Sequence, residues 1–280
     1  MHPILFHIGP VKFYTYGLMI ALGFLLATAL MQRDARRTGV IDPNLLAMMS
    51  LWALVLGVLG TRLLHIIMYP EGYSWSDPIG WINLTRGGLV FHGAIPVVLV
   101  YCIVELRRRK IPFWPVADIV MPYVPLAHAF GRMGCFFYSC CYGKRADNLP
   151  WAVRFPEGSQ PYLDHASHPG FPLDQHWSYP VHPTQLYSVL GLLLLFGLLY
   201  LLRAKWHPFA GFTFPVYFIG YGLKRFIVEF YRGDGNPTNF GFGVLSNQQV
   251  FCIVMVVVGA GLFVYLKRRA MRLGQDAPLR

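Results

Sequence analysis

The chain has 280 residues, of which 55% are hydrophobic and 13% charged, and its formal net charge is +11 at pH 7. A soluble domain carries about 25% charged residues, so this composition excludes an ordinary soluble protein and predicts one that crosses a membrane repeatedly. The basic excess does not indicate binding to nucleic acid, because most basic residues follow apolar runs in short clusters, which is a topology signal.

Seven apolar segments reach the roughly 20 residues that a helix needs to cross a bilayer. They lie near residues 13–32, 45–68, 87–106, 115–136, 183–202, 211–231 and 245–266. Basic clusters follow four of them: Arg33 to Arg37, Arg107 to Lys110, Arg203 with Lys205, and Lys267 to Arg269. All four lie on the cytoplasmic side if the N-terminus is outside and the C-terminus inside. We therefore predict an all-α polytopic integral membrane protein with seven transmembrane helices, folded as one domain over residues 1–280.

Two further features bear on the topology. The first apolar segment is not expected to be a cleaved signal peptide, because its basic residues follow the apolar run and no small-residue cleavage site precedes them. The longest stretch that does not span, residues 138–181, is rich in Pro, Gly, His, Asp and Trp. On this topology it lies outside, between the fourth and fifth spans, and we expect a small extracytoplasmic cap there.

Polar residues inside the apolar segments gather at one depth. On the predicted topology they lie in the outer leaflet: Tyr16, Arg62, His92, Arg132, His182, Gln185, Tyr187, Tyr221, Arg225, Glu229, Arg232 and Gln249. Solvated helix ends are the alternative, but they would place polar groups at both ends of a span, whereas the inner ends offer mainly Lys and Arg. We therefore predict a shared cavity in the outer leaflet.

Two arginines in these segments suggest what the cavity binds. A charge at membrane depth is energetically unfavourable, and arginine does not lose its proton in a protein. Tyr221, Arg225 and Glu229 recur every four residues and Arg232 follows, so we expect all four on one helical face. A purely structural Arg225–Glu229 ion pair is the alternative. Because Arg132 has no carboxylate nearby in sequence, we favour two convergent cations that bind one phosphate diester.

A histidine and a group of cysteines complete the candidate chemistry. His92 lies in GGLVFHGAIP, and the pKa of histidine suits general-base work near neutrality, although a structural histidine is the alternative. Of the five cysteines, Cys102 and Cys252 are interpreted as small apolar residues. Cys135, Cys140 and Cys141 cluster in GCFFYSCCYGK. Without a paired C-x-x-C spacing we predict no metal site. A structural role is favoured over a catalytic thiol, and a disulfide of Cys135 with Cys140 or Cys141 stays open if the outside is oxidising.

Several motifs in the same order resemble those of the prolipoprotein diacylglyceryl transferase family over almost the whole chain. IGPVKFYTYGLMIALGF is similar to the family's opening IGP…YGL segment, and RGGLVFHGA to its GG-x-x-FHGG segment. GRMGCFFYSCCYG aligns with the signature GR-x-GNF-x-N-x-E-x-x-G. HPTQLY resembles HPSQLYE, and YGLKRFIVEFYR resembles YG-x-x-RF-x-x-E-x-x-R.

The resemblance implies a seven-helix enzyme of the bacterial inner membrane with its active site facing the outer leaflet. Such an enzyme moves an sn-1,2-diacylglyceryl group from phosphatidylglycerol to the lipobox cysteine thiol of a prolipoprotein, forming a thioether and releasing glycerol phosphate. The implied partners are phosphatidylglycerol, the lipobox of the signal peptide and membrane lipids, with no nucleic acid and no cofactor. It implies His92 as the base for the thiol, Arg225 with Glu229 and Tyr221 as further catalytic residues, and Arg132 as the phosphate ligand. Tyr16, His182, Gln185 and Gly143 also match family positions and are expected to bind substrate.

The chain departs from the family pattern beside Arg132. Cys135 and Tyr138 stand where the signature has asparagine, Cys140 where it has glutamate, and Ser188 where HPSQLYE has its glutamate. These departures keep an alternative open, in which a divergent paralogue binds phospholipid without transfer or uses another acceptor. An anion transporter is a weaker alternative, because the inner halves of the spans lack matching polar residues.

Overall fold

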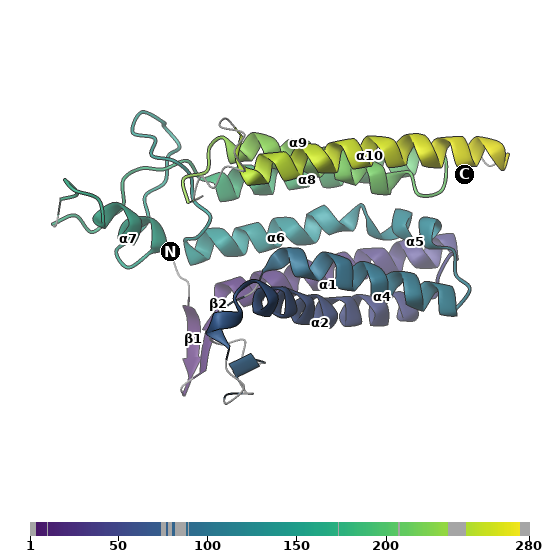
Figure 1. Cartoon of the computed structure of the whole chain (residues 1–280), viewed down its shortest axis with the longest axis horizontal. Helices are drawn as coiled ribbons and strands as arrows, with labels where there is room; N and C mark the ends of the chain where they lie inside the picture. The colour runs from purple at the N-terminus through teal and green to yellow at the C-terminus, as the bar shows by residue number, and fades with distance from the viewer. Residues whose placement is uncertain are drawn as a thin grey trace. The chain divides into compact units, whose positions relative to one another are not determined.

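The computed structural model describes residues 4–9, 11–73, 77, 80–81, 88, 90–172, 174–206, 208–234 and 245–274. A hairpin of β1 (Ile4–Ile8) and β2 (Val11–Tyr14) precedes the helices (Figure 1). The helices are α1 (Thr15–Thr38), α2 (Pro43–Met68), α4 (Ala94–Arg108), α5 (Phe113–Val120), α6 (Tyr123–Tyr138), α7 (Gln160–Ala166), α8 (Thr184–Lys205), α9 (Thr213–Glu229) and α10 (Asn247–Arg272). Short 3₁₀ turns occupy η1 (Pro70–Gly72) and η3 (Phe91–Gly93).

The helices agree with a membrane protein of mainly α structure. Among the described residues, α1, α2, α8 and α10 are each long and apolar enough to cross a bilayer. The predicted segments 87–106, 115–136 and 211–231 overlap α4, α6 and α9, which have 15, 16 and 17 residues. These three helices are shorter than the roughly 20 residues of a full crossing, so their membrane crossing remains a prediction.

Two local features differ from the sequence prediction. The segment 115–136 is not one helix, because α5 ends at Val120 and α6 begins at Tyr123. Pro122 lies at this break, where the missing N–H of proline cannot continue the helical ladder. The β1–β2 hairpin was not predicted; it pairs Ile4 with Tyr14 and Ile8 with Val11, and the rings of Phe6 and Phe13 stack at 4.6 Å.

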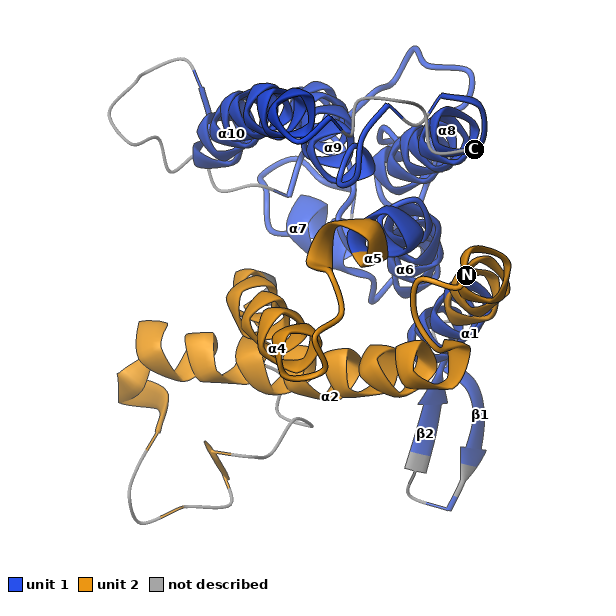
Figure 2. Ribbon diagram, turned by 90° about the vertical axis from the view of Figure 1, so that its right-hand side faces the viewer, with its two compact units in different colours: residues 1–27, 117–280 blue, residues 28–116 orange. Residues whose placement is uncertain are grey.

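The described chain groups into two compact units, residues 28–116 and residues 1–27 with 117–280 (Figure 2). In the first unit α2 packs on α4 through two glycines. A Cβ on Gly60 would lie 2.6 Å from the carbonyl oxygen of Gly93, so the two backbones touch and only glycine fits. Gly93 is the last residue of η3, so this contact also fixes the position of the turn that carries His92.

In the second unit α9 packs on α10 and α6 packs on α8. Small residues again allow the close approach, since a Cβ on Gly222 of α9 would lie 3.0 Å from the carbonyl oxygen of Cys252 on α10. Asp118 of α5 caps the start of α9: its Oδ1 accepts from the backbone N–H of Thr213 at 2.9 Å and from Thr213 Oγ1 at 2.7 Å. The polar residues of α9 are therefore held on a helix that is fixed along its length.

The stretch between α6 and α8 forms a small folded cap in this second unit. Its longest described helix is α7, with seven residues. Val153 forms bridges with Val181, and Pro156 with Trp177. The buried side chains of Tyr142, Phe155 and Val181 form its core. The stretch coincides with the segment 138–181 in which a cap was expected, and its location outside the membrane stays a prediction.

Candidate functional site

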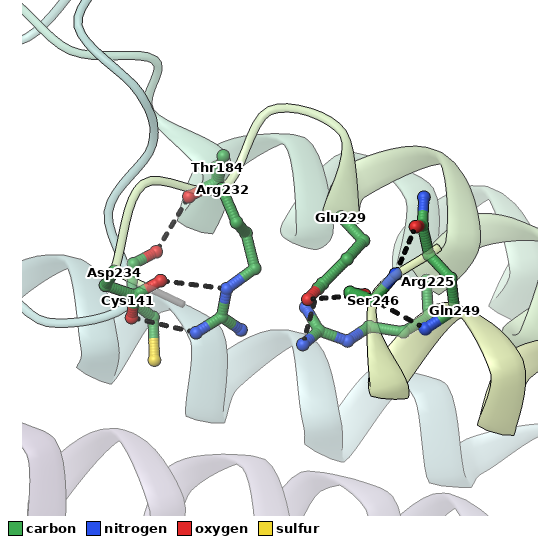
Figure 3. Close-up of polar contacts among 8 residues, drawn as sticks. All are labelled: Cys141, Thr184, Arg225, Glu229, Arg232, Asp234, Ser246 and Gln249. Carbon is green, nitrogen blue, oxygen red and sulfur yellow. Dashed lines mark hydrogen bonds and ion pairs between the residues drawn. The ribbon is translucent and has the colours of Figure 1, made fainter. Parts of the chain in front are cut away.

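The polar face of α9 carries a buried ion pair. Arg225 Nη2 lies 2.9 Å from Glu229 Oε2, and both side chains are at most 12% exposed (Figure 3). Ser246 Oγ lies 3.4 Å from Glu229 Oε1, and a capping box that Ser246 and Gln249 form at the start of α10 holds Ser246 in place. A supported carboxylate thus fixes one edge of the Arg225 guanidinium.

The pair leaves a polar atom unused. Arg225 Nη1 is buried and has no hydrogen-bond partner in the described part of the chain. Buried donors without partners are rare in folded proteins because each costs free energy. An anionic ligand that accepts from Nη1 would remove this cost. One side of the Arg225 guanidinium, Nη2, is therefore paired with Glu229, and the other side, Nη1, is suited to a ligand.

A second cation on α9 was missed by the sequence analysis. Lys224 lies beside Arg225, and its Nζ is buried without a hydrogen-bond partner among the described residues. The Nζ sits 4.9 Å from the ring centroid of Tyr221. The aliphatic stem packs on α8, where a Cβ on Gly191 would lie 2.6 Å from Lys224 Cγ. In sequence, Lys224 looks like any other basic residue. The only indication of its burial is Gly191 on α8, whose lack of a side chain leaves space for the lysine.

Arg132 on α6 belongs to the same electrostatic group. His128, one turn earlier on α6, has its ring 5.6 Å from that of Tyr221 and interacts electrostatically with Arg132, Lys224 and Arg225. Arg132 itself forms no ion pair or hydrogen bond with the described residues. We call Arg132, Lys224 and Arg225 the cationic cluster. Two of its members are guanidinium groups and among the described residues only one carboxylate, that of Glu229, pairs with them, so the cluster has an excess of positive charge that suits a phosphate group.

Gln185 and Thr184 hold the loop that follows α6. Gln185 Nε2 donates to the Cys140 carbonyl at 2.7 Å, and Thr184 Oγ1 donates to the Cys141 carbonyl at 2.7 Å. Ser139 and Cys141 both have positive φ, 62° and 60°, a conformation that few non-glycine residues adopt without support. The expectation that Gln185 binds substrate remains a prediction; its amide nitrogen positions this loop.

Gly143 lies where three backbone segments meet. Its N–H donates to the His182 carbonyl at 3.0 Å, and the next N–H, that of Lys144, donates to the Tyr231 carbonyl at 2.8 Å. A Cβ on Gly143 would lie 2.5 Å from His182 O and 2.7 Å from Tyr231 O. Gly143 also forms a bridge with Arg232. The glycine is required because these backbones leave no room for a side chain.

Gly143→Ala is expected to lower the free energy of unfolding by about 1–3 kcal/mol, because the added methyl group overpacks the point where the three backbone segments meet. The melting temperature in detergent should fall, and transfer activity with it, because the loop beside Arg132 shifts. Gly197→Ala is the matched control, since a Cβ on Gly197 of α8 meets no atom within 4 Å. An unchanged melting temperature for Gly143→Ala would contradict this account.

One expectation about Arg232 was wrong. Because α9 ends at Glu229, Arg232 does not continue the helical face of Tyr221 and Arg225. It lies in the turn beyond and forms a two-point ion pair with Asp234, at 2.9 Å and 2.8 Å (Figure 3). Burial raises the pKa of the Asp234 carboxyl, and Arg232 opposes that rise. The prediction from helical spacing was wrong for Arg232 because the helix ends before this residue.

His182 and Tyr16 occupy separate edges of the same unit. His182 Nδ1 lies 3.1 Å from the hydroxyl of Tyr187, which accepts from Trp151 Nε1 at 2.8 Å. Tyr16, at the start of α1, is 39% exposed. Its ring covers the space at Gly134, where a Cβ would lie 2.8 Å from Tyr16 Cδ2. His182 is thus oriented by Tyr187 of α8, which Trp151 of the cap contacts in turn. Tyr16 packs on α6 two residues from Arg132.

The sulfur atoms of Cys135, Cys140 and Cys141 all lie within 4.8 Å of one another, and all three cysteines are free thiols. Hydrogen bonds from the thiols of Cys135 and Cys140 lower the pKa of the Cys141 thiol, and Arg132 and Arg232 act in the same direction. The sequence spacing did not indicate this convergence, because it depends on the two positive-φ residues of the loop.

In the unit formed by residues 28–116, His92 is exposed within η3, directly before α4. Arg62, which was predicted to be one of the polar groups of the cavity, lies in the same unit. Arg62 is buried and donates to three carbonyls: Gly80 at 2.7 Å, Trp81 at 3.0 Å and Gly88 at 3.1 Å. Arg62 therefore fixes the backbone at Gly80, Trp81 and Gly88.

These features define a helical integral membrane protein with a partly buried cationic cluster suited to a phosphate group. The model of the prolipoprotein diacylglyceryl transferase family matches residues 3–265. The phosphatidylglycerol–prolipoprotein diacylglyceryl transferase of Chromobacterium violaceum is 35% identical over 95% of this chain and 96% of its own length. That of Azoarcus sp. is 36% identical over 93% of each chain, and that of Erwinia tasmaniensis 34% identical over 95% and 92%. The chain belongs to the prolipoprotein diacylglyceryl transferase family.

Proposed function

We propose that this protein transfers the sn-1,2-diacylglyceryl group of phosphatidylglycerol to the lipobox cysteine of a prolipoprotein. The thiol sulfur forms a bond to the terminal glycerol carbon of the diacylglyceryl group. The bond between that carbon and its phosphate oxygen breaks, and glycerol phosphate leaves with the electron pair. The family match over nearly the whole chain carries this proposal, and the cationic cluster supplies the matching chemistry.

The cationic cluster would act mainly on the leaving group. A phosphate diester carries one negative charge, and the departing phosphate gains a second as the carbon–oxygen bond breaks. Cations aimed at that oxygen therefore bind the transition state more strongly than the substrate, which is what lowers a barrier. The unpartnered Arg225 Nη1 and Lys224 Nζ are the donors available for this in the described structure, with Arg132 as the ligand of the same phosphate.

We propose His92 as the base that takes the thiol proton. A cysteine thiol has a pKa near 8.5 and needs only modest activation near neutrality. Support comes from the match of RGGLVFHGA to the family motif and from the rigid placement of η3 through Gly60 and Gly93. Tyr221, His182 and Tyr16 are proposed to shape the site around the two substrates.

The departures at Cys135, Tyr138 and Cys140 favour a second candidate, a paralogue that binds phospholipid without transfer. Complementation separates the two functions. A bacterium depleted of its own transferase should regain growth and lipid-modified lipoproteins when it expresses this chain. Confirmed membrane expression without either would favour the paralogue.

We propose seven crossings of the bacterial inner membrane with the cap outside and the C-terminus inside. The last turns of α1, α4, α8 and α10 all carry basic residues, and these four ends share one side on that topology. Green fluorescent protein fused after Arg280 should fluoresce, and alkaline phosphatase fused there should be inactive. Phosphatase inserted at Gly158 in the cap should be active. The reverse pattern would overturn the orientation.

Lys224→Met is expected to lower transfer about tenfold, mainly through a lower kcat, because one of the three cations proposed to stabilise the leaving phosphate is lost. Methionine keeps the contact with Gly191 and Tyr221, so folding should be preserved. Lys267→Met on the exposed end of α10 is the control and should leave the kinetics unchanged. Steady-state rates in mixed micelles check this, and unchanged kinetics for Lys224→Met would remove Lys224 from the site.

A further inference from the structure

The thiols of Cys135, Cys140 and Cys141, at the end of α6 and in the loop that follows it, form a group that the proposed transfer does not use. Their sulfur atoms lie within 4.8 Å of one another. A zinc ion with Zn–S bonds of about 2.3 Å and tetrahedral angles separates its sulfur ligands by about 3.8 Å. The side chains thus need to close by no more than about an ångström, a change that small χ1 rotations supply.

The backbone explains why these residues meet. Cys135 lies in the last turn of α6, and the Cys140 N–H donates to its carbonyl at 3.1 Å. The left-handed conformations of Ser139 and Cys141 turn the chain back over this helix end. Thr184 and Gln185 then hold the carbonyls of Cys141 and Cys140 from α8. The ligand positions are therefore preorganised by contacts that do not involve the sulfurs.

Two arginines and a helix end shape the electrostatics of this thiol group. Arg132 and Arg232 both act electrostatically on the Cys141 thiol, so they offset part of the negative charge of a tris-thiolate. The group also lies at the C-terminal end of α6, where the helix dipole favours a cation. Figure 3 shows the Cys141 sulfur beside the Arg232–Asp234 pair.

We propose that Cys135, Cys140 and Cys141 bind one thiophilic metal ion, Zn²⁺ or Cu⁺, through three thiolates. Soft sulfur ligands select these two ions. Zn²⁺ would take a solvent molecule as its fourth ligand, whereas Cu⁺ would be coordinated by the three sulfur atoms alone. Binding releases the thiol protons to solvent and changes no oxidation state. The ion would fasten residues 139–141 to α6, next to Arg132, in the part of the signature where this chain has cysteines in place of asparagine and glutamate.

The test is metal binding by the full-length protein in detergent, purified under reducing, oxygen-free conditions. After loading with Zn²⁺ or Cu⁺ and desalting, mass spectrometry of the metal content should give about one ion per chain. Replacing zinc by Co²⁺ should add the absorption of sulfur-to-cobalt charge transfer. The two loading arms decide which ion the site prefers.

The affinity for the metal ion should fall at least tenfold in each of the variants Cys135→Ser, Cys140→Ser and Cys141→Ser, because each variant removes one ligand. Cys102→Ser, on α4, is the matched control and should keep it. Circular dichroism and gel filtration confirm that each variant is folded, and three independent variants guard against one that is not. The proposal would be overturned if the folded wild type bound no ion, or if all serine variants bound it equally. It would also be overturned if protein isolated from membranes and then unfolded had only one of these three thiols open to alkylation, because the other two would then form a disulfide.

Discussion

Arg225→Met is expected to reduce diacylglyceryl transfer by about a hundredfold or more, the usual effect of removing one donor to a developing oxyanion. The variant should also be less stable, because Glu229 keeps a buried charge without its partner. Breaking a buried ion pair from one side costs about 3–5 kcal/mol. Activity and melting temperature measured on the same preparation therefore both fall.

The double variant Arg225→Met with Glu229→Gln separates these two effects. It removes both charges of the pair and leaves Ser246 an amide partner, so most of the lost stability should return. Transfer should stay as low as in the single variant, because the donor to the phosphate is still missing. A double variant that regains both stability and transfer would show that the pair is purely structural.

Arg132→Gln is expected to reduce transfer by about a hundredfold to a thousandfold with little change in melting temperature. The contrast with Arg225 follows from the structure, since Arg132 has no ion-pair partner in the described chain and its loss leaves no buried carboxylate unpaired. The loss should be greatest in kcat/KM for phosphatidylglycerol and small in KM for the peptide. Lys267→Gln is the matched control for loss of one positive charge.

A partial return of activity in Arg132→Lys would indicate a point charge acting on phosphate, and no return would indicate that two-point guanidinium contact is needed. Full activity in Arg132→Gln would exclude Arg132 from the phosphate site.

Much of the fold was predictable because hydrophobicity acts locally along the chain. Each of the seven predicted segments overlaps a helix, and the Arg225–Glu229 contact followed from the spacing of four residues on α9. The non-spanning segment 138–181 was recognisable from its composition. These features depend on neighbours in sequence, and a single chain is enough to infer them.

The features that were missed depend on contacts between distant segments. Burial of Lys224 requires Gly191 on α8, which leaves space for the lysine stem. Convergence of the three thiols requires left-handed backbone at Ser139 and Cys141, which the spacing of cysteines does not reveal. The prediction that Arg232 lies on the α9 face was wrong because Arg232 pairs with Gly143 beyond the end of that helix. None of these leaves a periodic signal in the sequence.

The most direct test of the account is a transfer assay with purified protein, phosphatidylglycerol and a lipobox peptide in mixed micelles. The proposed function predicts a peptide whose mass increases by one diacylglyceryl group on its cysteine, with an equal amount of glycerol phosphate released. Arg132→Gln should yield almost none of either. Folded wild-type protein that binds phosphatidylglycerol but forms no thioether would contradict the proposed function.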